Sequence, residues 1–507
     1  MMRAPNSIPA AVNGPTGRLT TDSLTEGGME GIADGRTGRL PDGPIDRLPE
    51  GHMDRLSEVS MGGLMDDLEE ERRRWLQSPY RSYLYSYPHK TAYRPLEPAL
   101  PLEELWQREE TDYYFLYMHI PFCGARCGFC NLFTLPDRRA EVHGQYVDAL
   151  ERQARQWAPW FAGRPFSRFA VGGGTPTLLE APLLNRLFDI AERVMGLDPS
   201  QASISVETSP DTVTEERLHV LKDRLTDRVS IGIQSFVEQE AAAIYRPQKP
   251  RLAEEALERL LAFEFPLVNV DLIYGLPGQT PESWLYSLEK ALRYAPGEIF
   301  IYPLYTRENT ILKPDRIRKQ GADIRLELYE MARQRLEEAG YTQYSMRRFS
   351  KVSGFAHKRI LPFSCQEEGM VGLGCGARSY TRPVHYASRY GVSQAATRSI
   401  IADYVAAERH DQADYGFVLS EAEQKRRYLL KAILHREGLE LASYEERFGS
   451  EAMREHPELE QLLRLGLAGL EAGVLRLTTL GMAYSDAIGD ELISADVRER
   501  MEGYELR

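Results

Sequence analysis

The sequence predicts an α/β protein in which a parallel sheet is covered by helices and followed by a small α-rich domain. Between residues 113 and 350, short runs rich in Val, Ile, Phe and Tyr alternate six times with runs of helical periodicity. Beyond residue 419, Leu and Ala recur at helical spacing. Alternating strands and helices form parallel sheets, so the pattern indicates either an open doubly wound sheet or a partial barrel.

Each strand is inferred from an apolar run that is bounded, in most cases, by Gly, Pro or Asp. The expected strands are Phe115–Ile120, Arg168–Val171, Ser203–Glu207, Arg228–Ile233, Val268–Tyr274 and Glu298–Leu304. The expected helices are Val142–Trp157, Leu179–Met195, Thr214–Asp223, Leu252–Glu264, Pro281–Tyr294 and Asp323–Ala339. In either architecture the ligand site lies at the carboxyl ends of the strands.

The segments outside this region differ in composition. Residues 1–70 are a Gly- and Pro-rich tail with few aromatic residues, which predicts disorder. Residues 71–112 are an aromatic lead-in, residues 351–418 a connecting segment that covers the pocket, and residues 419–507 the C-terminal domain. Within that domain, residues 475–482 resemble a wing followed by a helix, although its acidic balance argues against DNA binding.

Composition narrows the functional classes. The 507-residue chain has a net charge of −13, which argues against a broad nucleic-acid-binding surface. No apolar stretch is long enough to span a membrane, and residues 1–14 carry Pro and Asn where a secretory signal needs an apolar core. The five cysteines are few and odd in number. We therefore expect a cytoplasmic protein, in a reducing compartment where thiols remain available for metal.

Cys123, Cys127 and Cys130 lie in one turn-rich loop directly after the first expected strand. Three thiolates hold three corners of a cubane iron–sulfur cluster and leave the fourth iron open to another ligand. A zinc site with His119 as the fourth ligand is one alternative, although zinc sites more often use two separated Cys/His pairs. Ordinary buried cysteines are another, because free Cys packs as a small hydrophobe.

Further chemically suggestive residues follow the other expected strands. The run Gly172–Thr177 joins a strand to a helix, and its glycines let a ligand approach unpaired backbone N–H groups. Glu207, Gln234 and Asp271 lie on the next three strands or at their ends, which suggests a ligand with amine and hydroxyl groups; each alone can also cap a turn. Arg246 can clamp a carboxylate, with a surface salt bridge as the alternative.

Four motifs, taken in their order along the chain, resemble those of a known family. They are Tyr-x-His-Ile-Pro-Phe-Cys-x3-Cys-x2-Cys from residue 117, Gly-Gly-Gly-Thr-Pro-Thr from 172, Val-Ser-Ile-Gly-Ile-Gln-Ser-Phe from 229, and Val-Asp-Leu-Ile-Tyr-Gly-Leu-Pro-Gly-Gln-Thr from 270. Together they resemble the radical S-adenosylmethionine (SAM) superfamily, specifically its oxygen-independent coproporphyrinogen III oxidase-like branch. The resemblance covers about residues 80–490.

The resemblance implies a partial (β/α)6 barrel with a small winged-helix-like C-terminal domain. It also implies that the three cysteines hold a [4Fe–4S] cluster, whose open iron binds S-adenosylmethionine. One-electron reduction, by a donor such as flavodoxin or ferredoxin, would cleave S-adenosylmethionine to methionine and a 5′-deoxyadenosyl radical. This radical would abstract hydrogen from a small-molecule substrate, so no catalytic side chain is nominated.

The resemblance assigns further residues to the cofactor site, namely Tyr117, Phe129, Gly173, Gly174, Thr175, Glu207, Gln234, Arg246 and Asp271. The two glycines and the threonine would contact the methionyl part and the arginine its carboxylate. The glutamate would take a polar group, and the glutamine and aspartate the ribose. The two aromatic residues would flank the cluster, which His119 would tune through hydrogen bonding.

Some positions depart from the family pattern. Coproporphyrinogen oxidases of this type carry a further cysteine where this chain has Leu132, and the related haem chaperones carry a haem signature where it has residues 355–363. Cys365 and Cys375 are additional and are interpreted as packing residues or pocket thiols. Four hypotheses therefore stay open: oxidative decarboxylation of a porphyrinogen or related substrate, a haem chaperone, a methyltransferase or cyclopropane-forming enzyme, and a zinc-stabilised scaffold.

Overall fold

The computed structural model describes residues 69–81, 84, 86–111, 113–246, 248–306, 310–312, 323–351, 369–391 and 393–504. The tail predicted to be disordered, apart from its last two residues, lies outside this part of the chain. Residues 355–363 and Cys365 also lie outside it. All the described residues belong to one structural unit, Leu64–Arg507.

Six parallel strands form the centre of the sheet, and they are the six that the sequence predicts. They are β2 (Tyr114–Ile120), β5 (Phe166–Gly173), β6 (Ser203–Thr208), β7 (Arg228–Gln234), β8 (Leu267–Tyr274) and β9 (Glu298–Pro303). Each strand pairs in parallel with the next one in this order. Because the order never reverses, right-handed crossovers place the connecting helices on one face, as in a partial barrel and unlike a doubly wound sheet.

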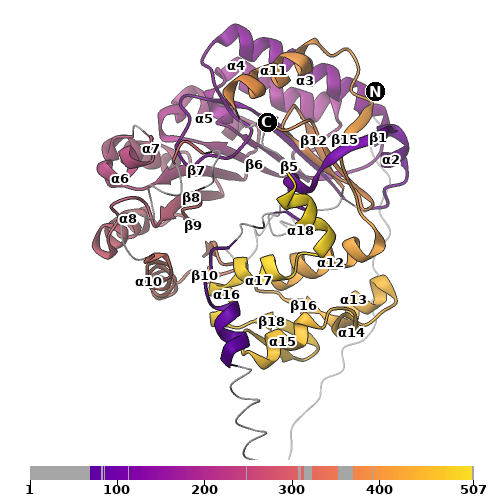
Figure 1. Cartoon of the computed structure of the whole chain (residues 1–507). Coiled ribbons are helices and arrows are strands. Elements are labelled where there is room, and N and C mark those ends of the chain that lie inside the picture. Colours follow the sequence, from indigo (N-terminus) through magenta and orange to yellow (C-terminus); the bar gives the residue numbers. More distant parts are fainter. Residues whose placement is uncertain are drawn as a thin grey trace, which may run out of the picture. The chain divides into compact units, whose positions relative to one another are not determined.

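The predicted helices are also present, and their ends lie within two residues of the expected ones. They are α3 (Ala140–Trp157), α4 (Ala181–Asp189) with its π-helical continuation Ile190–Val194, α5 (Glu215–Asp223), α7 (Pro250–Ala262), α8 (Pro281–Arg293) and α10 (Arg325–Glu338). Figure 1 shows these helices outside the strands. Within the described part of the chain, no helix has the length and apolar character needed to cross a membrane.

Seven strands that the sequence did not predict extend the sheet on both sides. Next to β2 come β12 (Met370–Leu373), β13 (Arg378–Tyr380), β14 (Val384–Ala387), β15 (Gln412–Val418) and β1 (Arg94–Pro101), and beyond β9 come β11 (Arg348–Ser350) and β10 (Thr342–Gln343). Most are too short to show a period of two. The strand β1 contains three prolines, which are tolerated because it lies at the edge of the sheet.

The two faces of the parallel strands differ in polarity. Every second residue, such as Val206, Val229 and Val270, belongs to the main hydrophobic core. On the other face, Asn269 Nδ2 donates a hydrogen bond to Ser230 Oγ at 2.7 Å. Along β7 and β8 the inner face of the barrel thus carries polar side chains, which is typical of a surface that receives a ligand.

A second hydrophobic core belongs to the C-terminal part of the chain. Its elements include α12 (Glu421–Ile433), the antiparallel strands β16 (Leu439–Glu440), β17 (Ala468–Glu471) and β18 (Val474–Leu477), and α16 (Thr479–Ala483). The hairpin of β17 and β18 followed by α16 confirms the predicted wing and helix. Asp486 accepts hydrogen bonds from Tyr305 and Arg347, which ties this part to the end of the barrel.

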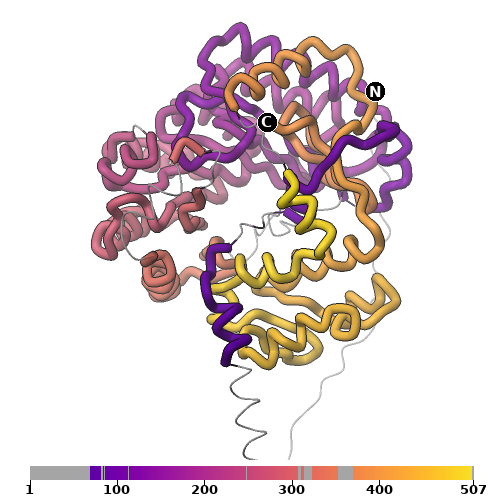
Figure 2. Tube along the Cα trace, in the orientation of Figure 1, coloured from indigo at the N-terminus to yellow at the C-terminus, as the bar shows by residue number. Residues whose placement is uncertain are grey.

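The aromatic lead-in connects both cores. Trp75, Tyr87 and Tyr93 are buried in the C-terminal core, and Tyr87 donates a hydrogen bond to Glu423 of α12. Further along, β1 pairs with β15 at the edge of the sheet. Figure 2 shows this indigo segment beside the yellow C-terminal helices and then beside the orange strands of the sheet. The lead-in is therefore part of the fold and not a loose extension.

Candidate active site

The three cysteines lie in a loop that begins where β2 ends. At the base of the loop, β3 (Phe122–Cys123) pairs in parallel with β4 (Leu135–Pro136). At its tip, Gly128 donates its N–H to Ile244 O at 2.7 Å, and the Gly128 carbonyl accepts the N–H of Leu312 at 2.9 Å. Backbone hydrogen bonds therefore hold the loop at both ends and fix the direction of its side chains.

The thiols of Cys123, Cys127 and Cys130 are close enough to affect one another. Burial raises the pKa of Cys123 to about 12, and the neighbouring thiols of Cys130 and Cys127 add to this rise. Burial also raises the pKa of Cys130, and the Cys127 thiol acts in the same direction. Three thiolates at this place therefore need positive charge, from metal or from nearby donors.

Donors from distant parts of the sequence face these sulfurs. Arg246 Nη1 lies 3.3 Å from Cys127 Sγ, and Thr175 Oγ1 lies 3.9 Å from Cys123 Sγ. Hydrogen bonds to ligating sulfurs stabilise an iron–sulfur cluster and set its reduction potential. The structure thus brings two of the predicted cofactor residues directly to the cysteine loop.

The spacing of the thiols bears on which metal fits. In the described part of the chain, no three His, Cys, Asp or Glu side chains stand close enough to share one metal ion. Ligands of a single zinc ion lie about 2.3 Å from it and hence within about 4 Å of one another. A cubane binds each thiolate through a different iron, which needs a wider spacing. The described residues therefore do not form the compact ligand set of a single zinc ion.

His119 makes its hydrogen bonds away from the sulfurs. Its Nε2 lies 2.9 Å from Phe133 O, and its Nδ1 lies 3.2 Å from the hydroxyl oxygen of Tyr117. Because a carbonyl only accepts, Nε2 carries the proton and Nδ1 accepts from the tyrosine. Burial lowers the pKa of His119 to about 4, so the ring is neutral at pH 7. Both ring nitrogens have partners, which disfavours His119 as a zinc ligand.

The glycine loop after β5 packs directly against the cysteine loop. Gly173 has φ +113°, and a Cβ on it would lie 2.5 Å from the His119 ring. A Cβ on Gly174 would lie 2.4 Å from Phe122 O and 3.0 Å from Cys123 Sγ. Only glycine allows this approach.

The sequence predicts that the backbone N–H groups of the same loop are free for a ligand. The structure shows that three of them already have hydrogen-bond partners. Gly173 N donates to Glu207 Oε2 at 3.1 Å, Gly174 N to Ile120 O at 2.7 Å and Thr175 N to Phe122 O at 2.8 Å. The loop uses its donors to attach itself to the strand ends.

Glu207 and Asp271 are two carboxylates at the open end of the strands. Burial among the strands raises the pKa of Glu207 to about 7, and the charge of Asp271 adds to the rise. The Glu207 side chain is nevertheless open to solvent, and water that reaches it reduces this rise. Burial raises the pKa of Asp271 to about 6, against the opposing effect of Arg228. At pH 7 or slightly above, both side chains can accept hydrogen bonds.

Gln234 and Arg246 occupy the neighbouring strand end. Gln234 has φ +71°, and the pairing of β7 with β8 shifts register between Gly232 and Gln234. This irregularity leaves the Gln234 amide close to Gly232. Arg246 donates to the Gly232 carbonyl and to Gln248 Oε1, in addition to its contact with the cysteine loop. Arg246 is thus held at the site by several bonds, and it is not the exposed salt bridge that the sequence left open.

The remaining predicted residues lie around this centre. Phe129 packs with Tyr302 on a small apolar cluster at the ends of β8 and β9. Cys375 is buried, with its Sγ 3.8 Å from the hydroxyl oxygen of Tyr146, which supports its interpretation as a packing residue. Lys90 contacts Asn131, the residue after the third cysteine, and the sequence analysis did not single it out. Its only signal was a charge within the aromatic lead-in.

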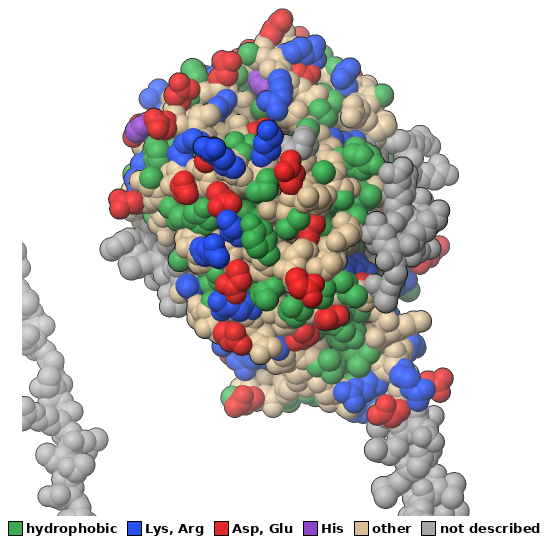
Figure 3. Space-filling model, turned by 90° about the vertical axis from the view of Figure 1, so that its left-hand side faces the viewer, with side chains coloured by type: hydrophobic (Ala, Val, Ile, Leu, Met, Phe, Trp, Pro, Cys, Tyr) green, Lys and Arg blue, Asp and Glu red, His purple; other side chains and the backbone are tan. Residues whose placement is uncertain are grey.

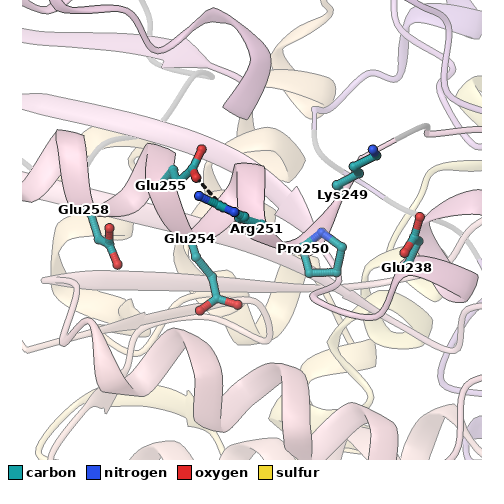
Figure 4. A pocket seen from close by; sticks show the side chains of 7 residues that line it. All are labelled: Glu238, Lys249, Pro250, Arg251, Glu254, Glu255 and Glu258. Atoms are coloured by element: carbon teal, nitrogen blue, oxygen red, sulfur yellow. Dashed lines mark hydrogen bonds and ion pairs between the residues drawn. The ribbon is translucent and has the colours of Figure 1, made fainter.

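A surface hollow of about 750 Å³ on helix α7 is a separate feature. Figure 4 shows the side chains that line it: Glu238, Lys249, Pro250, Arg251, Glu254, Glu255 and Glu258. Its charged groups are paired along the helix surface, as in Arg251 with Glu255 and Lys290 with Glu254. Figure 3 shows basic and acidic side chains interspersed on this face. None of the predicted site residues lines the hollow, so it is an ordinary charged surface.

Comparisons with known proteins agree with this geometry. Residues 117–291 match the family model described as "Radical SAM superfamily". The chain is 28% identical over 333 residues to an oxygen-independent coproporphyrinogen III oxidase of Salmonella typhimurium, covering 62% of this chain and 72% of that protein. It is 30% identical over 270 residues to the heme chaperone HemW of Escherichia coli, covering 52% of this chain and 68% of that protein.

The fold has a solved counterpart as well. The structure of coproporphyrinogen III oxidase (HemN) from Escherichia coli matches with a TM-score of 0.63 at 21% identity, covering 80% of this chain and 93% of that chain. An α/β barrel of parallel strands with a cysteine loop after its first strand defines the class. The chain belongs to the radical SAM superfamily, in the branch that contains HemN and HemW.

Proposed function

We propose that this protein is a radical SAM enzyme in which Cys123, Cys127 and Cys130 hold a [4Fe–4S] cluster. The observation that carries the proposal is the meeting of three neighbouring thiols with two hydrogen-bond donors, Thr175 from the loop after β5 and Arg246 from the segment after α6. When bound, the reduced cluster supplies the electron that splits S-adenosylmethionine into methionine and a hydrogen-abstracting 5′-deoxyadenosyl radical. The side chains of this chain bind and orient that ligand and exclude water.

The polar residues around the thiols suit the parts of S-adenosylmethionine. Glu207, open to solvent beside the glycine loop, accepts a hydrogen bond from the ammonium group. Arg246, two of whose nitrogens face Gly232 and the cysteine loop, pairs with the carboxylate. Gln234 and Asp271, on adjacent strands, bond the ribose hydroxyls. Tyr117 and Phe129 border the ligand on its two sides.

The substrate is a porphyrinogen or a related small molecule, and its reaction is oxidative. Support comes from the relatives named coproporphyrinogen III oxidase and from the polar inner face of the barrel. A small one-electron donor protein, flavodoxin or ferredoxin, supplies an electron to the cluster. Leu132 occupies the place of the extra cysteine in those oxidases, and its side chain is 45% exposed at the edge of the cysteine loop.

A haem chaperone is the second candidate, because relatives of that name match as well as the oxidases do. In this case the cluster and S-adenosylmethionine serve a protein that binds haem and turns over little substrate. The two functions make opposite predictions for haem affinity and for product formation, so one set of measurements separates them.

The test is anaerobic. Protein reconstituted with iron and sulfide is assayed for its metal content, for its visible spectrum, and for 5′-deoxyadenosine released with dithionite, with and without coproporphyrinogen III. About four irons per chain and 5′-deoxyadenosine support the radical enzyme, and loss of porphyrinogen carboxylates selects the oxidase. Stable haem binding without turnover selects the chaperone. The absence of 5′-deoxyadenosine from protein with a full cluster contradicts the enzyme. The variant Cys127→Ser serves as the control without a cluster.

A further inference from the structure

Lys90 connects the aromatic lead-in to the cysteine loop. It opens the short 3-10 helix Lys90–Ala92, and its Nζ lies 3.1 Å from the carbonyl oxygen of Asn131. The same ammonium lies 3.7 Å from the ring centroid of Tyr390. The Tyr390 hydroxyl also donates to the Asn131 carbonyl. One backbone carbonyl therefore receives both a charged and a neutral donor.

The other end of this peptide unit faces a cysteine. Asn131 directly follows Cys130, and the backbone N–H of the next residue, Leu132, faces the Cys130 thiol and acts to lower its pKa, although burial raises it more. Thr134 Oγ1 stands 3.9 Å from the same sulfur. The peptide between Asn131 and Leu132 thus has Lys90 at its oxygen and the sulfur at its nitrogen.

A cation at a carbonyl oxygen polarises the whole peptide. Electron density moves toward the oxygen, the N–H becomes a stronger donor, and its bond to a sulfur strengthens, because hydrogen bonds in chains reinforce one another. The face of the Tyr390 ring attracts the ammonium group and helps to hold it beside the carbonyl. The charge also reaches the site directly, since Lys90 contributes to the lowered pKa of the buried His119, after burial and Arg378.

We infer that Lys90 is a positioning residue that raises the reduction potential of the [4Fe–4S] cluster through the Asn131–Leu132 peptide. This inference rests on the proposed function, because it needs a cluster on the three cysteines. Reduction adds negative charge to the cluster, and a stronger hydrogen bond and a nearby cation both favour the more negative state. The lead-in, which lies outside the strands of the barrel, therefore takes part in tuning the metal.

The test is the midpoint potential of the reconstituted cluster, measured without S-adenosylmethionine by anaerobic redox titration followed by electron paramagnetic resonance. Lys90→Met keeps the length of the side chain and removes the charge. We expect reduction to become about tenfold less favourable, a shift of about 59 mV to more negative potential for one electron. Lys90→Arg should restore most of the difference, and Tyr390→Phe should give a smaller shift of the same sign.

Lys222 offers a matched control. Its Nζ donates to the backbone carbonyls of Phe263 and Glu264 at 2.7 and 2.8 Å, and it lies 5.7 Å from the Phe265 ring centroid, on a helix remote from the cysteines. Lys222→Met should therefore leave the potential unchanged.

Each outcome decides the question. An unchanged potential in Lys90→Met with full iron content overturns the inference and leaves Lys90 as an anchor of the loop. If Lys90→Met takes up no cluster, Tyr390→Phe decides in its place, and a wild-type potential in that variant overturns the inference. A cluster that forms and shifts as expected, but releases no 5′-deoxyadenosine, supports the role of Lys90 while it contradicts the proposed enzyme.

Discussion

The carboxyl group of Glu207 gives the most direct test of the cofactor site. Burial raises its pKa to about 7. The ionised fraction of a group with that pKa falls from about nine-tenths at pH 8 to about one-tenth at pH 6. The ionised form accepts a hydrogen bond from the ligand ammonium group, and the protonated form loses most of that interaction. The affinity for S-adenosylmethionine should therefore decrease as the pH falls through 7.

The size of the effect follows from linkage. A pKa of about 7 would make the dissociation constant rise about tenfold between pH 8 and pH 6, and water at the exposed carboxylate makes this the upper bound of the rise. A hydrogen bond to a charged group contributes about 1.5–3 kcal/mol. Glu207→Gln should therefore bind about 10- to 100-fold more weakly than the wild type at pH 8. At pH 6 the difference between the two proteins should be smaller, by at most about tenfold.

Anaerobic isothermal titration calorimetry of the cluster-loaded proteins measures both constants. The ratio of the wild-type and Gln-variant constants cancels any titration of S-adenosylmethionine itself, so the ratio reports Glu207 alone. Water at the exposed carboxylate moves the pH at which the affinity changes toward the ordinary pKa of 4.5. The direction of the change stays the same, with weaker binding at lower pH. A ratio that stays constant between pH 5 and pH 8, or that grows as the pH falls, refutes the placement of Glu207 against the ligand.

Three other predictions concern Gly173, His119 and Arg246, which lie around the cysteine loop. Gly173→Ala places a Cβ 2.5 Å from the His119 ring at a φ of +113°, and should lower the free energy of unfolding in urea by about 3 kcal/mol. The control Gly163→Ala, at φ +76° with open space around it, should lower it by about 1 kcal/mol, and equal losses would contradict the clash. In the apoprotein, burial holds the pKa of His119 at about 4 against 6.5 unfolded, so stability should fall by about 3 kcal/mol from pH 6.5 to pH 4, and His119→Gln should flatten this part of the pH profile. Arg246→Ala should weaken S-adenosylmethionine binding at least about tenfold at full iron content, and binding at wild-type strength would remove Arg246 from the site.

How far the sequence predicts this molecule depends on the length and regularity of each element. The six central strands and their helices are long, with apolar runs ended by Gly, Pro or Asp, and they were predicted within two residues. The strand β12 has four residues and pairs with β2 across more than 240 residues of chain, so no local signal marks it.

The same contrast between local and long-range signals applies to the residues of the candidate site. The cysteines and the glycine loop are contiguous motifs whose chemistry is local, and the structure brings them together. The role of Lys90 depends on one backbone carbonyl 41 positions away, which sequence spacing cannot reveal. The occupied N–H groups of Gly173 and Gly174 also follow from tertiary contacts alone, since the same glycines in a different register would have left them free.

The polar inner face of the barrel explains how a carboxylate stays ionised deep among strands. Glu298 accepts hydrogen bonds from Arg228 and Arg348, and although burial acts to raise its pKa, the two arginines together lower it. Glu298 and both arginines lie near the amino ends of their strands. Asp271, further along the neighbouring strand, lies within reach of Arg228, which opposes the rise in pKa that burial causes. With a pKa of about 6, Asp271 is mostly ionised at pH 7 and can accept hydrogen bonds from hydroxyl groups. The ion pairs at one end of the strands therefore help to prepare the acceptor at the other end, which an apolar barrel interior could not do.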